Sequence, residues 1–373
     1  MASMPLIKFL LERYPERQIV VTTMTPTGSE RVKSLFGDSV FHVYLPYDLP
    51  GAMARFIKRI DPALLLIMET ELWPNLLHKC RKAGCRTMLV NARLSEKSAR
   101  GYRRLGPLTR TMLGDLDIIA AQAAPDAERF LALRARPAQV EVTGSLKFDM
   151  KTPELSGRVS PVFYQVAQLG RPVLVAASTR EGEEEKVLAA FRVCLARVPD
   201  LLLVLVPRHP ERFNSVARLC EDQGFTVLRR SSDSGADTDT QVFLGDSMGE
   251  MWNYYFLGSV AFVGGSLVDM GCHNVLEPAA LGLPVLVGPS RFNFETICNL
   301  LQEAGALITV ADEQDLAQQL LQLLGNDSWR KAMGKAGKQV VASNRGCLQR
   351  LSALIEARLA EADSAVGKSV TDV

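Results

Sequence analysis

The stretch VAFVGGSLVDMGCHNVLEPAALGLPVLVG, residues 260–288, contains the unit from which the fold is predicted. It predicts a buried strand at 260–265, an apolar helix beginning near Asn274, and a second short strand at 283–288 after a Gly-Leu-Pro break. Both strands are continuous apolar runs without polar alternation, which is typical of parallel strands covered on both faces. A strand, a helix and a parallel strand together form one βαβ unit.

The same alternation runs along most of the chain. Strands are expected at 18–23, 40–45, 63–68, 86–91, 117–121 and 139–144, and then at 172–178, 201–207, 225–230, 241–245, 260–265, 283–288 and 306–310. Helical stretches separate them, so the predicted class is α/β, with two Rossmann-like doubly wound domains facing each other across a cleft.

The alternation weakens at 150–171, where Pro, Ser and Gly collect in KTPELSGRVSPVFYQ. We therefore expect a first domain over 1–150 and a second over 151–345. Residues 346–373 are expected to form a C-terminal helix that packs back on the first domain.

Composition excludes several classes of protein. The chain has 373 residues, enough for two domains, and its net charge of +2 gives no indication of a nucleic-acid partner. Seven cysteines without a CxxC pair argue for reduced thiols and against a disulfide framework or a zinc site. No apolar run is long enough to span a membrane, and the opening MASMPLIKFLLERYPERQ predicts an amphipathic helix, not a signal peptide. No GxGxxG at the first βα turn, no P-loop and no HExxH is present, so neither a cofactor nor a metal site is expected.

Two candidate residues follow strands of the first half. Glu69 and Glu71 come after 63–68 and would face opposite ways if that strand continued, although two solvated loop carboxylates are an equally good interpretation. Lys147 lies in GSLKFD after the strand at 139–144. It could stabilise negative charge on a leaving phosphate, or it could be an ordinary surface lysine.

The second half has candidates at the ends of three strands. In ASTREGEEE (177–185), Ser178 or Thr179 can cap the next helix, whose first turn is acidic. The N-terminus of that helix could also bind phosphate, although a simple cap is at least as good an interpretation. In PRHPERF (207–213), Arg208 offers a planar fork for phosphate and His209 can donate or titrate. In GDSMGE (245–250), Glu250 and free N–H groups could contact a base or a ribose.

The stretch at 260–288 contains two further candidate features, the pair Gly264-Gly265 and the motif HNVLE at 273–277. The two glycines would allow the backbone to approach a ligand closely. Asn274 can cap the helix, with Glu277 three residues later in a capping-box arrangement. Glu277 could therefore cap its own helix or accept hydrogen bonds from ribose hydroxyls, and the residues leave both interpretations open.

A basic run, RLSEKSARGYRRLGPLTRTM, occupies residues 93–112. A solvated basic face is the usual interpretation of such a run. The alternative is a surface for an anionic amphiphile or a membrane, because apolar residues alternate with its basic residues, among them Arg93, Lys97, Arg100, Arg103 and Arg104.

Taken in order, these motifs resemble one family, the 3-deoxy-D-manno-octulosonic acid (Kdo) transferases of lipopolysaccharide assembly. The matching text runs from about residue 5 to about residue 355: VTTMTPTGSERV, HVYLPYDLP, METELWPN, NARLSEKSARGY, TGSLKFD, LVPRHPERF, MGE, FVGGSLV and HNVLEPAA. The resemblance implies an inverting GT-B glycosyltransferase at the cytoplasmic face of the inner membrane. Its second domain would bind the donor CMP-Kdo, and its first would receive the lipid A precursor, lipid IVA.

The resemblance also implies roles for particular residues. The positions that match the family's CMP-binding residues are Pro207, Arg208, Met248, Gly249, Glu250, Asn274, Val275, Leu276 and Glu277. Glu69 and Lys147 match residues credited with stabilising the transition state. Position 275 is Val where the family often has Pro. The basic run would meet the phosphates and acyl chains of lipid A.

One departure from the family concerns its start. The family has an N-terminal membrane anchor and a first strand that ends in a glutamate taken as the general base, and both are expected upstream of Met1. A sheet lacking that strand should fold poorly, and the chain should bind CMP-Kdo but transfer slowly, since a lost general base costs about 10²–10⁴ in rate. A UDP-sugar epimerase of the same shape and a non-catalytic nucleotide-binding protein are the alternative hypotheses.

Overall fold

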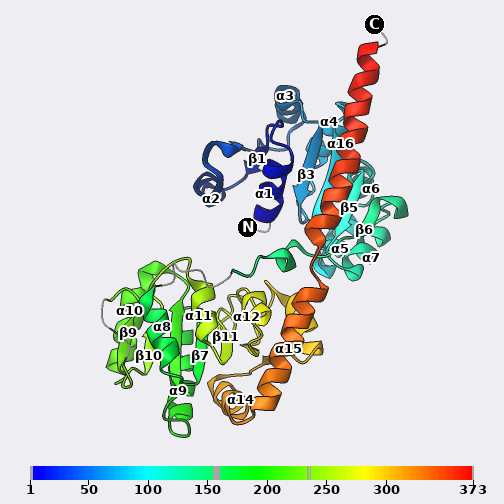
Figure 1. Cartoon of the computed structure of the whole chain (residues 1–373). Coiled ribbons are helices and arrows are strands. Elements are labelled where there is room, and N and C mark those ends of the chain that lie inside the picture. Colours follow the sequence, from blue (N-terminus) through cyan, green and yellow to red (C-terminus); the bar gives the residue numbers. More distant parts are fainter. Residues whose placement is uncertain (1–2, 154–159, 233–234, 236, 372–373) are drawn as a thin grey trace. The chain divides into compact units, whose positions relative to one another are not determined.

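The computed structural model describes residues 3–153, 160–232, 235 and 237–371, and it divides the chain into two compact units. Unit 1 consists of Met1–Met150 together with Asn344–Val373, and unit 2 consists of Lys151–Ser343 (Figure 1). Each unit has its own sheets and its own core.

The described strands of unit 1 form two parallel sheets. One contains β1 and β2, and the other has the order β3-β4-β5-β6, so that β1 and β3 each pair with a single neighbour. The strands are β1 (Val20–Thr23), β2 (Phe41–Tyr44), β3 (Leu64–Met68), β4 (Arg86–Ala92), β5 (Ile118–Ala121) and β6 (Val140–Val142). The helices are α1 (Met4–Arg13), α2 (Pro26–Phe36), α3 (Pro50–Ile60), α4 (Pro74–Lys82), α5 (Glu96–Arg104), α6 (Gly106–Gly114), α7 (Ala124–Ala132) and α16 (Cys347–Thr371).

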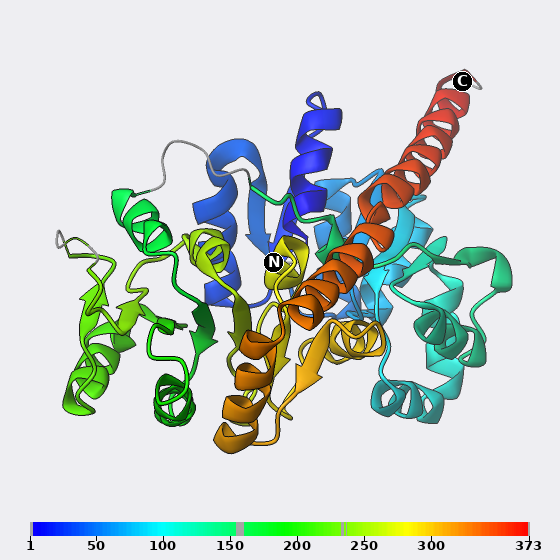
Figure 2. The same cartoon turned by 60° about the horizontal axis from the view of Figure 1, so that its bottom comes forward.

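Both faces of the four-stranded sheet are covered, because its strands are apolar on both sides. On one face, Leu89 and Ile119 pack with residues of α4, α6 and α7 such as Phe130. On the other face, residues of β4 and β5 such as Met88 and Ile118 pack against α1 and against the apolar side of α16. Figures 1 and 2 show α16, in orange to red, running along this sheet.

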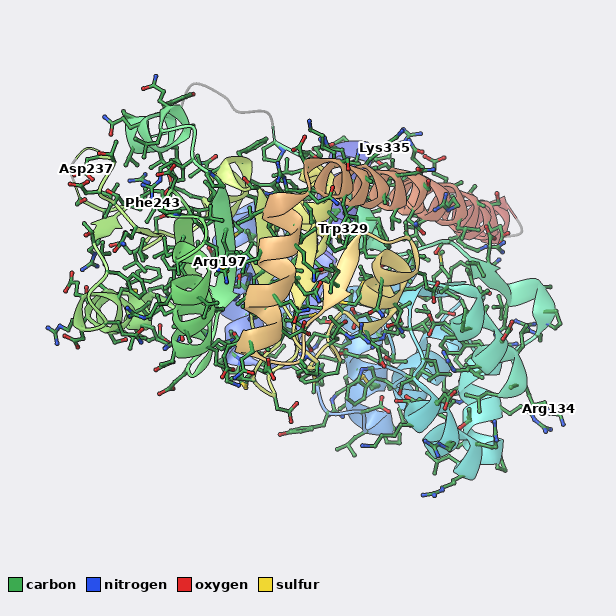
Figure 3. All side chains as sticks on the ribbon, turned by 90° about the horizontal axis from the view of Figure 1, so that it is seen from below. Arg134, Arg197, Asp237, Phe243, Trp329 and Lys335 are labelled. Atoms are coloured by element: carbon green, nitrogen blue, oxygen red, sulfur yellow. The ribbon has the colours of Figure 1, made fainter. Side chains whose placement is uncertain are left out.

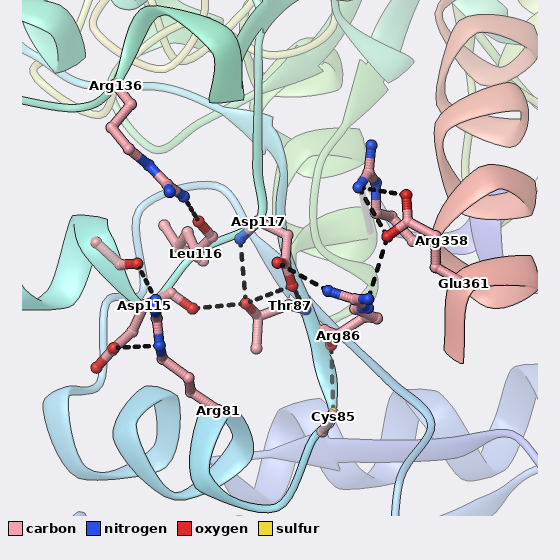
Figure 4. A network of polar contacts seen from close by, with 11 residues as sticks. Arg81, Cys85, Arg86, Thr87, Asp115, Leu116, Asp117, Arg136, Arg358 and Glu361 are labelled. Atoms are coloured by element: carbon pink, nitrogen blue, oxygen red, sulfur yellow. Dashed lines mark hydrogen bonds and ion pairs between the residues drawn. The ribbon is translucent and has the colours of Figure 1, made fainter. Parts of the chain in front are cut away.

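A polar network at the amino ends of β4 and β5 also holds α16 (Figure 4). Arg86 lies between Asp117, 3.5 Å away, and Glu361 of α16, 3.4 Å away. The carboxylate of Asp117 also accepts a hydrogen bond of 2.8 Å from the backbone N–H of Thr87. The last helix of the chain is therefore attached to unit 1 by both apolar and charged contacts.

Unit 2 contains one parallel sheet with the order β13-β12-β11-β7-β8-β10-β9. Its strands are β7 (Val173–Thr179), β8 (Leu202–Pro207), β9 (Val227–Arg229), β10 (Val242–Leu244), β11 (Val260–Val263), β12 (Val285–Val287) and β13 (Leu307–Thr309). Its helices are α8 (Pro161–Gln168), α9 (Glu183–Leu195), α10 (Phe213–Asp222), α11 (Met251–Leu257), α12 (Leu276–Leu281), α13 (Glu295–Glu303), α14 (Glu313–Gly325) and α15 (Asp327–Ser343).

The order of these strands creates a topological switch point. From β7 the chain continues to β8 on one side, and it reaches β11, the neighbour of β7 on the other side, only after β9 and β10. In open α/β sheets, ligands bind outside the carboxyl ends of the strands at such a point. Apolar clusters cover both faces of the sheet, one including Phe191 and Phe262 and the other including Phe243 and Tyr254.

The predicted α/β class and every predicted strand are confirmed in the described residues, and no strand end differs from its predicted position by more than two residues. All strand pairs are parallel, as the continuous apolar runs indicated. Among the described residues, no helix combines the length and the apolar character needed to cross a bilayer.

Candidate functional site

The predicted nucleotide-binding segments of unit 2 lie at one edge of its sheet. Residues 207–208 end β8, residues 248–250 follow its neighbour β10, and residues 273–277 follow β11. The loop after β7, residues 180–182, lies between the ends of β8 and β11. We call this edge the carboxyl edge of unit 2.

The loop after β7 differs from the sequence prediction. Helix α9 begins at Glu183, and its N-cap is Gly182 with a φ of 84°. Neither Ser178 nor Thr179 caps it, so that prediction is wrong, because a short loop separates the strand from the helix. The hydroxyl of Thr179 instead donates a hydrogen bond to the carboxylate of Glu184, and its carbonyl accepts the N–H of Arg208.

Two adjacent glutamates of α9 connect the loops of the carboxyl edge. The fully buried carboxylate of Glu183 accepts backbone N–H groups from the β7 loop and from the turn after β11, namely those of Arg180, Gly265, Ser266 and Leu267, at 2.5–2.9 Å. The neighbouring Glu184, also fully buried, accepts both terminal nitrogens of Arg212 in the β8 loop, at 2.5 and 3.1 Å. The acidic first turn of α9 therefore fixes the positions of the loops on either side of it.

The glycines at 264 and 265 allow close approach of the chain's own backbone. A Cβ at Gly264 would lie 2.6 Å from the carbonyl oxygen of Ser178, and a Cβ at Gly265 would lie 2.5 Å from the carbonyl oxygen of Gly271. Gly265 also has a φ of +78°, which glycine adopts without strain. These contacts bring the β11 turn against the β7 loop, so the space around both glycines is occupied by protein.

Arg180, His209 and His273 meet at the ends of β7, β8 and β11. Nε of Arg180 donates to Nε2 of His273 at 3.2 Å, and Nη1 of Arg180 donates to Nε2 of His209. Burial and, next, the positive charges of Arg180 and Arg208 lower the pKa of His273 from 6.5 to about 4. His273 is therefore neutral at physiological pH.

The start of α12 corrects the capping-box prediction for Glu277. The helix begins at Leu276 with Val275 as N-cap, so Glu277 is its second residue and the required spacing is absent. Asn274 still contributes, since its side-chain oxygen accepts the N–H of Leu276 at 3.1 Å. Burial raises the pKa of Glu277, while a hydrogen bond from Asn274 opposes the shift. The carboxylate of Glu277 is thus left for a partner other than its own helix.

The segment 248–250 combines an exposed part with a half-buried carboxylate. Met248 is 58% exposed, and Gly249 has a φ of +84°. One oxygen of Glu250 accepts a hydrogen bond from Arg230 at 2.8 Å. The other, Oε2, is buried without a hydrogen-bond partner in the described part of the chain, which makes it a good acceptor for a ligand hydroxyl or amine.

In unit 1, Glu69 does not continue its strand. Strand β3 ends at Met68, and Glu69 has a φ of +59°, so the condition under which Glu69 and Glu71 would alternate is not met, and both residues lie in the loop after the strand. The N–H of Glu69 donates to the carbonyl of Val90 in β4, which holds this left-handed residue at the carboxyl end of the sheet. Left-handed non-glycine residues cost about 1–3 kcal/mol and concentrate at functional sites.

Lys147 lies at the same end of the four-stranded sheet. It belongs to a short 3₁₀ helix, Leu146–Asp149, whose N-cap Ser145 accepts the N–H of Lys147. The N–H of Leu146 donates to the side-chain oxygen of Asn91 in β4, at 3.1 Å. Glu69 and the Lys147 segment are thus both attached to the last residues of β4.

The basic run lies on and around α5. Ser95 caps this helix, and the hydroxyl of Tyr102 donates to the carbonyl of Thr70, beside Glu69. Its basic side chains Lys97, Arg100, Arg103 and Arg104 are exposed, whereas Arg93, before the helix, is half-buried. Leu105 and Leu108, at 52% and 45% exposed, add apolar surface beside the basic side chains.

Sequence reasoning missed four members of the carboxyl edge, Arg180, Glu183, Glu184 and Arg212, and gave no role to His273. The run REGEEE indicated only a capped helix, because nothing in it shows that two of three consecutive glutamates are fully buried. Their position directly after a buried strand, beside PRHPERF in the sheet, was the available signal.

Unit 2 also has a cavity of about 500 Å³ that is lined by Arg171, Arg197 and Arg330 among others. It includes Pro172 and Ser259, which precede β7 and β11, so it lies at the amino ends of the strands. It is therefore separate from the carboxyl edge.

Two solved structures share the fold of nearly the whole chain. A putative UDP-N-acetylglucosamine 2-epimerase from Listeria monocytogenes is 17% identical and gives a TM-score of 0.61, covering 97% of this chain and 94% of its own. The MurG of Acinetobacter baumannii is 11% identical and gives a TM-score of 0.58, covering 95% of each chain. Together with the parallel sheets, they place the chain in the GT-B class of α/β proteins.

The sequence comparisons define the family. The family described as 3-deoxy-D-manno-octulosonic-acid transferase (kdotransferase) matches residues 1–150, and glycosyl transferases group 1 match residues 178–340. A 3-deoxy-D-manno-octulosonic acid transferase of Haemophilus influenzae is 43% identical over 356 residues, which are 95% of this chain and 83% of that protein. The chain belongs to the 3-deoxy-D-manno-octulosonic acid transferase family and is a glycosyltransferase, as its motifs indicated.

Proposed function

We propose that this protein transfers Kdo from CMP-Kdo to a lipid A precursor, lipid IVA, in the assembly of the lipopolysaccharide core. Family membership supports the reaction. The observation that carries the proposal is the convergence of 207–208, 248–250 and 273–277 at the carboxyl edge of unit 2. This is where a parallel sheet binds a nucleotide.

Within this proposal, unit 2 is the donor unit. Arg208 binds the phosphate of CMP through its planar guanidinium. Glu277 accepts hydrogen bonds from the ribose hydroxyls, a role supported by its position in the first turn of α12 and by its half-buried carboxylate. Glu250 binds the nucleoside through Oε2, while its other oxygen is held by Arg230.

The proposed chemistry is an inverting displacement. An acceptor hydroxyl attacks the anomeric carbon of Kdo and gives up its proton to a general base. The bond from that carbon to the phosphate oxygen breaks, and CMP leaves with the electron pair. Arg208 and Lys147 stabilise the charge that develops on the leaving phosphate, and Glu69 stabilises the transition state. A monophosphate leaving group carries less charge than a diphosphate. Fixed cations and backbone N–H groups can balance this smaller charge.

Unit 1 is the proposed acceptor unit, at the cytoplasmic face of the inner membrane. The exposed side chains of Lys97, Arg100, Arg103 and Arg104 have no acidic partner within 4 Å among the described residues. They are therefore available for the phosphates of lipid A, and Leu105 and Leu108 for its acyl chains.

The test is Kdo transfer from freshly generated CMP-Kdo to lipid IVA by the wild type and by Arg208→Gln. We expect Arg208→Gln to weaken CMP binding by about 10- to 100-fold, because a charged hydrogen-bonding partner of the phosphate is lost. UMP should bind the wild type more weakly than CMP. Equal binding of UMP and CMP with no transfer would contradict the proposal and favour a UDP-sugar epimerase.

A further inference from the structure

The carboxyl edge of unit 2 contains a guanidinium that is held in place without being neutralised. Arg180 follows β7, His273 follows β11, and these two strands are the pair at the topological switch point. The 3.2 Å hydrogen bond from Nε of Arg180 to Nε2 of His273 therefore crosses the position where the fold is expected to bind its ligand. His209, at the end of β8, contacts Nη1 of the same guanidinium.

The direction of these hydrogen bonds fixes the charges. An arginine side chain donates and never accepts, so the Nε2 atoms of both histidines must be acceptors. Each imidazole then carries its proton on Nδ1 and is neutral. Burial and the charges of Arg180 and Arg208 keep His273 in this form, since they lower its pKa to about 4. The two histidines thus orient Arg180 without reducing its positive charge.

Other arginines of unit 2 differ from Arg180 because they form ion pairs with carboxylates. Arg212 is paired with Glu184, Arg229 with Asp246, and Arg230 with Glu250, each at 2.5–2.8 Å. Among the described residues, no carboxylate lies within 4 Å of the Arg180 guanidinium. The adjacent Glu181 is exposed, and Glu183 is saturated by backbone N–H groups. The remaining N–H groups of Arg180, at its Nη1–Nη2 end, form a fork that matches a carboxylate.

We propose that Arg180, oriented by His209 and His273, binds the carboxylate of the donor sugar. The inference rests on the proposed function, because the proposed donor has two anionic groups, the phosphate of CMP and the carboxylate of the octulosonic acid. Arg208 is assigned to the first of these. Arg180 is a cation of the same edge with no carboxylate within 4 Å among the described residues. It is positioned beside Arg208, since the N–H of Arg208 donates to the carbonyl of Thr179.

The test compares two ligands that differ only in the sugar acid. Thermal-shift titrations with CMP and with freshly generated CMP-Kdo give the affinity of each for the wild type, for Arg180→Gln and for Arg180→Lys. We expect the wild type to bind CMP-Kdo more tightly than CMP. Arg180→Gln should bind CMP-Kdo about 10- to 100-fold more weakly than the wild type does, while its affinity for CMP should stay within about twofold of the wild-type value. Arg180→Lys should recover part of the loss. Arg197→Gln, an exposed arginine at the other end of the strands, is the matched control (Figure 3).

A second pair of variants keeps Arg180 in place. His209→Gln retains a neutral acceptor for Nη1, whereas His209→Glu supplies a carboxylate that neutralises the guanidinium. His209→Glu should therefore lower the preference for CMP-Kdo over CMP further than His209→Gln does. Equal losses in the two variants would overturn the inference.

The outcomes separate this inference from the proposed function. Arg180→Gln with unchanged affinity for CMP-Kdo would overturn the inference, and so would an equal loss for CMP, which would assign Arg180 to the phosphate. A wild type that binds CMP no less tightly than CMP-Kdo would also overturn it. A wild type that prefers CMP-Kdo through Arg180 but transfers no Kdo would leave the inference standing and contradict the proposed function.

Discussion

At the scale of single residues, the loops around the proposed donor site depend on Glu183. Its fully buried carboxylate accepts four backbone N–H groups, from Arg180 and from residues 265–267. Glu183→Gln would replace one acceptor oxygen by an amide that faces these donors. We expect a loss of about 2–4 kcal/mol in the free energy of unfolding, because buried donors lose their partner. Urea denaturation of the whole chain measures this loss.

The control for this prediction is the next glutamate but one. Glu185→Gln makes the same chemical change on the same turn of α9, but Glu185 is exposed. Its free energy of unfolding should change by no more than about 0.5 kcal/mol. Equal stability of the two variants would show that the turn after β11 holds its shape without Glu183.

His273 makes stability depend on pH in a defined window. Its pKa in the folded protein is about 4, against 6.5 without the fold, because of burial and the charges of Arg180 and Arg208. Between these values the unfolded chain binds a proton that the folded chain does not, so stability falls as pH falls through this window. We therefore expect the wild type to lose more stability than His273→Gln between pH 7 and pH 5. Parallel losses in urea denaturation at the two pH values would contradict this.

Some local features at the candidate site could not be predicted from residue types. Glu69 and Ser178 have positive φ values at the ends of β3 and β7, and Asn91 has one within β4. No propensity favours the left-handed region for a glutamate or a serine, and these conformations are held by tertiary hydrogen bonds such as that from Glu69 to Val90. For this reason the sequence left the conformation of Glu69 open, and the suggested N-cap at Ser178 was wrong.

At the scale of elements, α5 is the part of unit 1 that we expect to meet a membrane. Its exposed basic side chains and Leu105 should bind vesicles that contain anionic lipid, and added salt should weaken the binding. Arg100→Glu with Arg103→Glu should reduce vesicle binding at least tenfold, because each basic residue near an anionic surface contributes about 1 kcal/mol. Sedimentation with vesicles containing phosphatidylglycerol measures this.

The control variant makes the same change in net charge elsewhere. Arg197→Glu with Lys335→Glu reverses two exposed cations of unit 2 (Figure 3). If the double substitution in unit 2 releases the protein from vesicles as effectively as the one in α5, overall charge and not this helix determines the binding.

The strands of this fold could be predicted from the sequence, whereas the helix boundaries at the candidate site could not. A parallel strand that is covered on both faces must be apolar throughout, and the strands from β7 to β13 are nearly all of this kind. The start of α12 depends instead on a turn between Gly271 and Leu276 that is set by contacts with β12 and its loop, such as the hydrogen bond from Cys272 to Ser290. Such contacts join segments that are distant in sequence and leave no periodic pattern.

At the scale of the whole molecule, the division of the chain into two units predicts how separate fragments should behave. Unit 2 has its own core, and all residues proposed to bind the donor nucleotide lie within Lys151–Ser343. Unit 1 is discontinuous, since α16 supplies Leu351, Ile355 and Leu359 to the core formed with Met88 and Ile118.

We therefore expect a fragment of residues 151–343 to fold alone, to melt cooperatively and to bind CMP within about threefold of the affinity of the whole chain. A fragment of residues 1–150 should aggregate, because without α16 the apolar face of β4 and β5 is exposed to water. Adding residues 344–373 as a separate peptide should recover part of its solubility. Calorimetric titration with CMP and size-exclusion chromatography test these expectations. A loss of CMP affinity of more than tenfold in the 151–343 fragment would mean that unit 1 contributes directly to nucleotide binding.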